Sequence, residues 1–224
     1  MRILLIAFLL ISTIGFSQDV LTKELGTFKE LKVFSGLTVE IEKADTPRIE
    51  ISGKKRNEVV IKNINGRLKL SMRFPETFSA YEADVKLYYS ENLLLVDANE
   101  GSIISCDTAI EQKSIELRAQ EGALINIPLN VNYLIGKAVT GGQLTVKGEL
   151  ESQDLELATG GIFNGYALEA NQTYITSSSG AVGKIFVNEM LDVKVSIGGS
   201  VYYMGNPTDV ISKKIIGGTI KSKD

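Results

Sequence analysis

The sequence has no histidine and no tryptophan, and it contains a single cysteine, Cys106, among 224 residues. Without histidine, Ser-His-Asp triads, histidine acid–base pairs and histidine metal sites are excluded. One cysteine excludes an intramolecular disulfide and a cysteine metal cluster, so Cys106 is expected to be a small buried residue. The commonest catalytic and metal-binding chemistries are therefore absent, and we expect no cofactor and no metal site.

The sequence also has slightly fewer basic residues than acidic residues. The chain has 24 Lys and Arg against 27 Asp and Glu, which gives a formal net charge of −3. Proteins that bind nucleic acid or anionic membranes need a basic face to neutralise phosphate groups. We therefore expect no nucleic-acid partner.

The N-terminus has the layout of a secretory signal. Met1-Arg2 precedes an apolar run of 14 residues, 3–16, and small residues stand at Gly15 and Ser17. The run is shorter than the roughly 20 residues that span a bilayer. We predict a cleavable signal peptide over residues 1–17 and a single mature domain over residues 18–224, with no transmembrane segment in the mature chain. The protein is expected in the periplasm, at the outer membrane or on the cell surface.

Glycine recurs through the second half of the chain at intervals of 19–21 residues. An apolar residue stands two places after each of these glycines. A fixed period of this size is typical of a solenoid, in which each repeat forms one coil. The glycines are Gly101, Gly122, Gly142, Gly161, Gly180, Gly199 and Gly218.

Within the repeats, apolar and polar residues alternate as in half-buried strands, for example at Leu155 and Leu157 and at Val193 and Val195. This pattern predicts an all-β fold, a right-handed β-helix (β-solenoid) with about 19–21 residues per coil. The apolar residues after the glycines are expected to stack as one core column along the coil axis. They are Ile103, Leu124, Leu144, Phe163, Val182, Val201 and Ile220.

Residues 19–99 are also β in character but less regular. Asn65-Gly66 lies between apolar segments and predicts a hairpin turn. We expect this irregular part to close the N-terminal end of the solenoid, because an open stack end exposes unpaired backbone groups. Charged side chains are expected to protect the other end, namely Lys213, Lys214, Lys221 and Lys223.

Two segments carry a resemblance to a known family. Phe34-Ser-Gly-Leu-Thr-Val39 and Ser196-Ile-Gly-Gly-Ser-Val-Tyr-Tyr-Met-Gly-Asn-Pro207, together with the glycine coils, resemble the putative auto-transporter adhesin, head GIN domain family of exported bacterial proteins. The similarity covers roughly residues 31–220. It implies a β-helix-like fold, a place in the cell envelope or on the surface, and a role in adhesion.

The candidate binding residues are two tyrosine pairs, Tyr88-Tyr89 and Tyr202-Tyr203. On a strand one member of each pair faces outward, where its ring can stack on a sugar or anchor an interface. The alternative is that one tyrosine of each pair packs in the core and the other covers the coil surface.

The acids of the repeats do not recur at one repeat offset, so we predict a solvated outer face and no catalytic residue. These acids are Asp97, Glu100, Glu111, Glu116, Glu121, Asp154, Glu156 and Asp192.

Together these features predict a non-catalytic exported protein that offers the broad faces of a solenoid to a partner. That partner would be a glycan or an envelope or surface protein. Two alternatives stay open: a polysaccharide-cleaving enzyme on the same scaffold, and a structural envelope protein that forms homo-oligomers.

Overall fold

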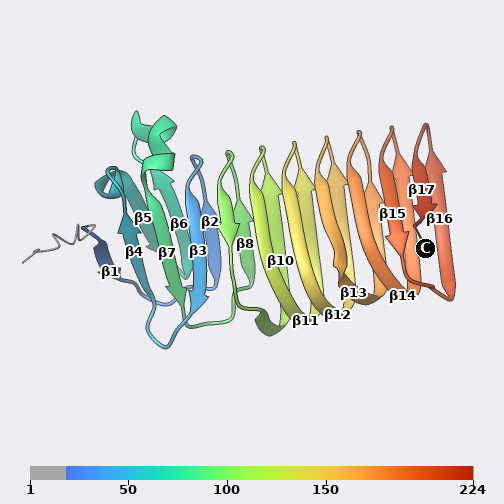
Figure 1. Ribbon diagram of the computed structural model, residues 1–224, viewed down its shortest axis with the longest axis horizontal. Coiled ribbons are helices and arrows are strands. Elements are labelled where there is room, and N and C mark those ends of the chain that lie inside the picture. Colours follow the sequence, from blue (N-terminus) through green and yellow to red (C-terminus); the bar gives the residue numbers. More distant parts are fainter. Residues whose placement is uncertain (1–18, 224) are drawn as a thin grey trace, which may run out of the picture.

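The computed structural model describes residues 19–223. The predicted signal peptide, residues 1–17, lies outside this part of the chain. The described residues form an elongated stack of β-strands with two short 3-10 helices (Figure 1). None of its helices is long and apolar enough to cross a membrane. The predicted all-β solenoid is confirmed.

The regular part of the solenoid consists of parallel coils. Its strands are β8 (Leu95–Ala98), β9 (Ile103–Ser105), β10 (Ile110–Gln120), β11 (Leu124–Val139), β12 (Gln143–Ala158), β13 (Ile162–Ser177), β14 (Val182–Ser196), β15 (Ser200–Met204), β16 (Asp209–Ile215) and β17 (Thr219–Ser222). Each of the long strands contributes to two walls of one continuous sheet. The segments that follow the glycine corners form the wall here called the post-corner wall, and the segments that lead into the next corner form the pre-corner wall. In β11, for example, Leu124 pairs with Gln143 on the first wall and Val139 pairs with Ala158 on the second.

The N-terminal part is interleaved in space. Its elements are β1 (Leu21–Glu24), β2 (Glu30–Val33), β3 (Thr38–Lys43), β4 (Arg48–Ser52), η1 (Arg56–Glu58), β5 (Val59–Ile64), β6 (Arg67–Met72), η2 (Glu76–Glu82) and β7 (Asp84–Tyr89). Strand β2 pairs in parallel with both β6 and β8, and β3 pairs with both β7 and β9. The coil of β2 and β3 therefore lies between two coils that come later in the sequence. Antiparallel β1, β4 and β5 close this end of the stack, as predicted.

Each corner has two residues with positive φ, and the second of them is glycine. Thr159 has φ 49° and Gly160 has φ 72°, and the Gly160 amide donates to the Ser179 carbonyl of the next coil at 3.1 Å. The third corner residue approaches the preceding coil so closely that a Cβ at Gly161 would overlap the Ala138 carbonyl. The predicted hairpin turn at Asn65-Gly66 has the same left-handed pair, with φ 53° and 75°, and connects β5 to β6.

Register places a continuous core column on the inner side of the post-corner wall. From β9 onward the aligned residues are Ile104, Ile125, Leu144, Phe163, Gly183, Val201 and Ile220. Phe163 supplies the bulk of this column, and its ring fills space that a Cβ at Gly165 would occupy.

The predicted column was therefore wrong at three positions. Ile103, Leu124 and Val182 point outward, one residue before the inner position, and Ile103 is 37% exposed. The reason lies in the corners. Every coil has glycine as its second corner residue, and some coils have glycine as the third corner residue as well. The prediction counted two places from the last glycine of each corner, so its starting point differed by one residue between these two kinds of coil. A slip of one residue moves a side chain to the opposite face of a strand.

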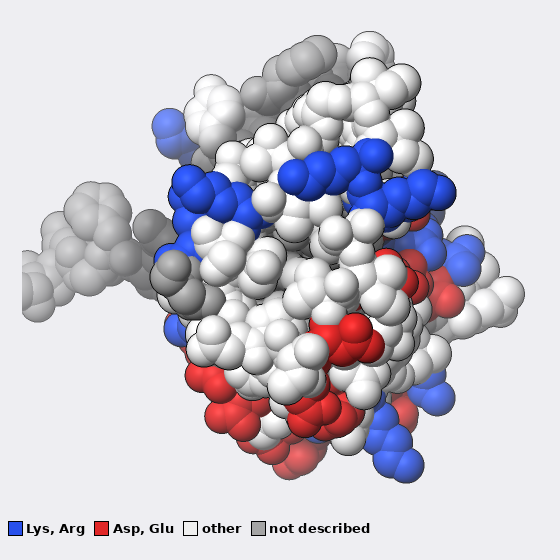
Figure 2. Space-filling view, turned by 90° about the vertical axis from the view of Figure 1, so that its right-hand side faces the viewer, with Lys and Arg blue, Asp and Glu red and all other residues white. Residues whose placement is uncertain are grey.

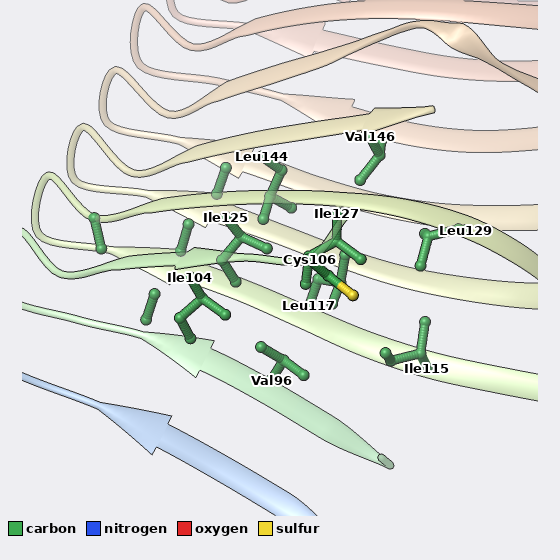
Figure 3. Packing of buried hydrophobic residues seen from close by; sticks show 14 of the residues in the cluster. Val96, Ile104, Cys106, Ile115, Leu117, Ile125, Ile127, Leu129, Leu144 and Val146 are labelled. Atoms are coloured by element: carbon green, nitrogen blue, oxygen red, sulfur yellow. The ribbon is translucent and has the colours of Figure 1, made fainter. Parts of the chain in front are cut away.

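Cys106 lies in the core between the two walls, near Ile127 and Leu117 (Figure 3). It is buried, as predicted, and its thiol donates to the Thr108 carbonyl at 2.9 Å. Burial raises the pKa of this thiol above its ordinary value. Since the thiolate is the reactive form, Cys106 is a packing residue.

The C-terminal coil ends the stack with charge on both sides of its strands. Lys214 pairs with Val195, so it occupies an inward register position, and Lys213 pairs with Lys194 on the outer side. Figure 2 looks onto this end and shows Lys and Arg across its upper part with Asp and Glu below. An inward charge on an edge strand opposes the addition of a further strand.

The register predicts opposite effects for two neighbouring residues of β11. Ile125→Asp places an unpaired charge in the core column and is expected to lower the free energy of unfolding by more than about 4 kcal/mol or to prevent folding. Leu124→Asp, on the outer side, is the matched control and should cost less than about 1 kcal/mol. Urea unfolding followed by circular dichroism measures both, and equal losses would contradict the register.

The corner geometry predicts a second contrast. Gly161→Ala is expected to cost more than about 3 kcal/mol, because its Cβ overlaps the Ala138 carbonyl and the backbone must move. Gly160→Ala meets no atom within 4 Å and has only its φ of 72° against it, so about 1 kcal/mol is expected. The same unfolding measurement applies, and a larger loss at Gly160 would show that conformation rather than close approach limits the corner.

Candidate functional site

The outer surface of the pre-corner wall is charged, and many of its charges are paired. Arg118 contacts Glu116 at 2.6 Å, and Lys137 contacts Glu156 at 3.0 Å on the neighbouring coils. Exposed pairs of this kind contribute little to stability. Their main effect is that each charge already has a partner within the protein.

Asp97 lies on the same wall, but unlike these charged residues it is buried. It is 2% exposed and accepts hydrogen bonds from Lys32 at 2.9 Å, Asn99 at 2.9 Å and Gln120 at 3.1 Å. The prediction that it belongs to a solvated face was therefore wrong. Because every bond comes from a neighbouring coil or from its own strand end, Asp97 joins the interleaved N-terminal coil to the regular repeats.

The post-corner wall has a different outer surface. One outward column runs through Ser105, Asn126, Thr145 and Asn164, which are aligned rung by rung. The column nearer the corners carries Ile103, Leu124, Gln143, Ile162 and Val182. From β9 onward these two columns contain no carboxylate. This wall therefore offers amide and hydroxyl groups beside an apolar stripe.

The polar column continues into Lys184, Tyr202 and Lys221 on β14, β15 and β17. The Lys223 ammonium lies 4.9 Å from the centre of the Tyr202 ring. Cation–π contact of this kind orders a ring without burying it.

Two further aromatic residues lie on neighbouring strands of this wall, and one of them, Tyr166, interacts with Tyr202. Partial burial and the neighbouring Tyr202 both raise the pKa of the Tyr166 phenol above its ordinary value. Phe186 is half-buried, pairs with Met204 on β15, and its ring lies against Gly205. We call Tyr166, Phe186 and Tyr202 the aromatic cluster.

The four predicted tyrosines do not form one site. Tyr202 faces outward, whereas Tyr203 packs against the core. Tyr88 and Tyr89 lie on β7, near the other end of the stack (Figure 1), and are only 8% and 3% exposed. Tyr88 is covered by the Arg48 guanidinium, 3.5 Å from its ring centre. Burial raises the pKa of Tyr89 to about 12.

Sequence reasoning missed Tyr166 and Phe186. A register shift between Thr145 and Lys147 against β13 adds one residue to that strand, and two further shifts follow between β13 and β14. The simple alternation of inward and outward residues fails there. A local excess of aromatic residues over three consecutive repeats was the one signal available.

The acids do recur at one offset, contrary to prediction. Glu111 pairs with Asn130, which pairs with Glu149, which pairs with Glu169. Asn130, Glu149 and Glu169 of this row border a hollow of about 310 Å³ at the bend between the two walls. Asn171 donates to Glu151 there at 3.0 Å. Within residues 19–223, no group of three or more acidic or cysteine side chains is arranged to hold a metal ion.

Comparisons with solved structures show where this fold occurs. A crystal structure of a putative adhesin from Bacteroides fragilis superposes with a TM-score of 0.78 at 17% identity, covering 92% of this chain and 98% of that one. A putative adhesin from Parabacteroides merdae gives 0.67 at 16% identity, with 94% and 98% covered. A putative lipid binding protein from Parabacteroides distasonis gives 0.68 at 13% identity, with the same coverage. At such identities the likeness establishes the fold alone.

No curated protein matches the sequence. A family model does, over residues 27–207, which spans the interleaved N-terminal part and the coils up to the segment after β15. This range contains both segments that carried the resemblance. The chain therefore belongs to the family described as putative auto-transporter adhesin, head GIN domain.

Proposed function

We propose that this protein is a non-catalytic, exported component of the cell envelope that binds a glycan or a protein through the outer surface of its post-corner wall. The observation that carries the proposal is the contrast between the two walls. On the pre-corner wall, charges such as Arg118 and Lys137 are paired with carboxylates. From β9 onward the two outward columns of the post-corner wall instead carry amides, hydroxyls and the Tyr202 ring without a carboxylate, although Asn164 donates to Thr145 at 3.5 Å and Lys223 lies over Tyr202.

The backbone supports this role by fixing the spacing of the binding groups. Parallel strands lie about 4.8 Å apart, so each coil presents one side chain per column at that interval. Ser105, Asn126, Thr145 and Asn164 offer donors and acceptors along such a row. A rigid wall holds these groups in place before a partner arrives, which lowers the entropy cost of binding.

The aromatic cluster adds apolar contact area, which contributes binding free energy that a row of polar side chains does not supply. Tyrosine combines a large apolar ring with a hydroxyl, and for this reason it is enriched where proteins meet sugars or other proteins. Tyr202 is the predicted binding residue that faces outward, and Tyr166 lies near it.

The relatives of known structure agree with a binding role but differ in the partner that their names imply. Two are described as putative adhesins and one as a putative lipid binding protein. One fold supports many functions, so the outward side chains decide the ligand. We assign the partner of this chain from its own wall.

A polysaccharide-cleaving activity finds less support. Glycoside hydrolysis needs two carboxyl groups on either side of the scissile bond, one of them protonated. On the pre-corner wall Glu116 and Glu156 are each bonded to a cation. In the acidic row, Asn130 separates Glu111 from Glu149, which leaves Glu149 and Glu169 as the one adjacent pair of carboxyl groups in that row.

Tyr202→Ala is expected to weaken binding of the partner about tenfold, since loss of an exposed anchor ring removes more than about 1 kcal/mol. Tyr174→Ala is the matched control, because Tyr174 is 38% exposed on the pre-corner wall. The mature protein is first screened against glycans and matrix proteins, and dissociation constants are then measured for both variants. Binding that survives Tyr202→Ala and is lost with Tyr174→Ala would place the site on the pre-corner wall and contradict the proposal.

Incubation of the mature protein with each bound glycan is expected to release no new reducing ends. A colorimetric reducing-sugar assay measures this, with a known glycosidase as the positive control. Steady release that follows protein concentration would contradict the non-catalytic assignment.

Cell fractionation is expected to find the protein in the periplasm, in the outer-membrane fraction or at the cell surface.

A further inference from the structure

We propose that the partner is an anionic polysaccharide, bound along the axis of the solenoid across Lys184, Tyr202 and Lys221. This inference rests on the proposed function and makes it specific. It concerns the C-terminal third of the post-corner wall, where the column of amides and hydroxyls gives way to cations.

The cations of this region stand in one row with an aromatic ring. Lys184, Tyr202 and Lys221 are aligned on successive rungs, so a lysine lies in register on either side of Tyr202. Lys147 lies on the same wall, in register with Pro128. Within residues 19–223 none of these three lysines lies within ion-pair distance of a carboxylate, unlike Lys137 and Arg118. Lys194 and Lys213 on the pre-corner wall are likewise outside ion pairs, but they are aligned with each other and have no ring between them. The charge of Lys184 and Lys221 is available to a ligand.

Protection of the strand edge does not explain this arrangement. Lys221 lies on the last strand of its wall, where a charge opposes edge-to-edge pairing. Lys184 lies on β14, however, and β15 and β17 follow it on the same wall. A lysine in the interior of a sheet protects no edge, so edge protection does not account for Lys184.

A chain of sugar rings fits the row better than other polyanions do. The rise of about 4.8 Å per coil is close to the length of one pyranose unit, so successive rungs meet successive sugars. The Tyr202 ring offers a stacking surface between two cations, and Asn164 and Thr145 continue the row with hydrogen-bonding groups. Carboxylate or sulfate groups on the sugars would then meet Lys184 and Lys221.

Nucleic acid and acidic protein fit less well. A nucleic-acid strand needs a basic face along its whole phosphate backbone, whereas this row offers two lysines separated by a ring on a chain of formal charge −3. Protein interfaces centre on anchors that fill desolvated pockets, whereas this wall presents a flat row of short polar side chains.

The experiment compares two double variants that remove the same charge from opposite walls. Lys184→Gln with Lys221→Gln removes the proposed contacts. Lys194→Gln with Lys213→Gln is the matched control, because these lysines are aligned on the pre-corner side of β14 and β16. The probes are polygalacturonate, a neutral β-glucan oligosaccharide and polyglutamate, each titrated against the full mature protein at two salt concentrations.

Polygalacturonate is expected to bind the wild-type protein, and more weakly at the higher salt. The Lys184/Lys221 variant should bind it at least about tenfold more weakly, whereas the control should stay within about twofold. Urea unfolding midpoints should be unchanged in both. A Lys184→Arg and Lys221→Arg double variant retains the charge and is expected to retain binding, which separates charge from folding.

Several results would overturn the inference. Equal losses in the two double variants would indicate general attraction by net charge, and equally tight binding of polyglutamate would point to an acidic protein. Absence of polygalacturonate binding would also overturn it. If a neutral glycan binds in a way that depends on Tyr202 but not on Lys184, this inference fails and the proposed function stands. If no binding depends on Tyr202, both fail.

Discussion

Every corner of this solenoid turns on the same pair of left-handed residues, the second of which is glycine. At Gly142, Gly161 and Gly199 the coils also approach so closely that a Cβ would overlap the carbonyl of the preceding coil. The turn fixes the register of both walls at once, since each corner joins a strand segment of one wall to a segment of the other. Register then decides which residue of each alternating pair is buried. The core column and the outward columns are two results of the same constraint.

Much of this arrangement is present in the sequence, because it depends on local rules. The period of 19–21 residues and the alternation at Leu155 and Leu157 are sufficient to predict a parallel β-solenoid. Which residue of each alternating pair faces the core was harder to predict. Where a corner ends in Ser102, Ala123 or Ala181 in place of glycine, counting from the last glycine gives the wrong face, and Ile103, Leu124 and Val182 were misplaced for this reason.

The rest depends on contacts between distant residues, which no local pattern encodes. Burial of Asp97 requires Lys32, 65 positions earlier, beside it. The aromatic cluster depends on register shifts that bring Tyr166 toward Tyr202. The difference between the walls likewise follows from which charges become neighbours. Relatives with 13–17% identity preserve the coils and are free to change these outward columns.

The interleaved coil also bears on the order in which the chain acquires its structure. Strand β2 needs β6 and β8 as its neighbours, and β3 needs β7 and β9. When the chain emerges N-terminus first, from a ribosome or through a membrane, β2 and β3 gain their first neighbours with β6 and β7 and have both neighbours only when about residue 105 has arrived. Contacts between such distant segments are slow to form because a long loop must close first. Each later coil needs only the coil before it, so growth toward the C-terminus is templated, and the kinetic bottleneck falls on the first hundred residues.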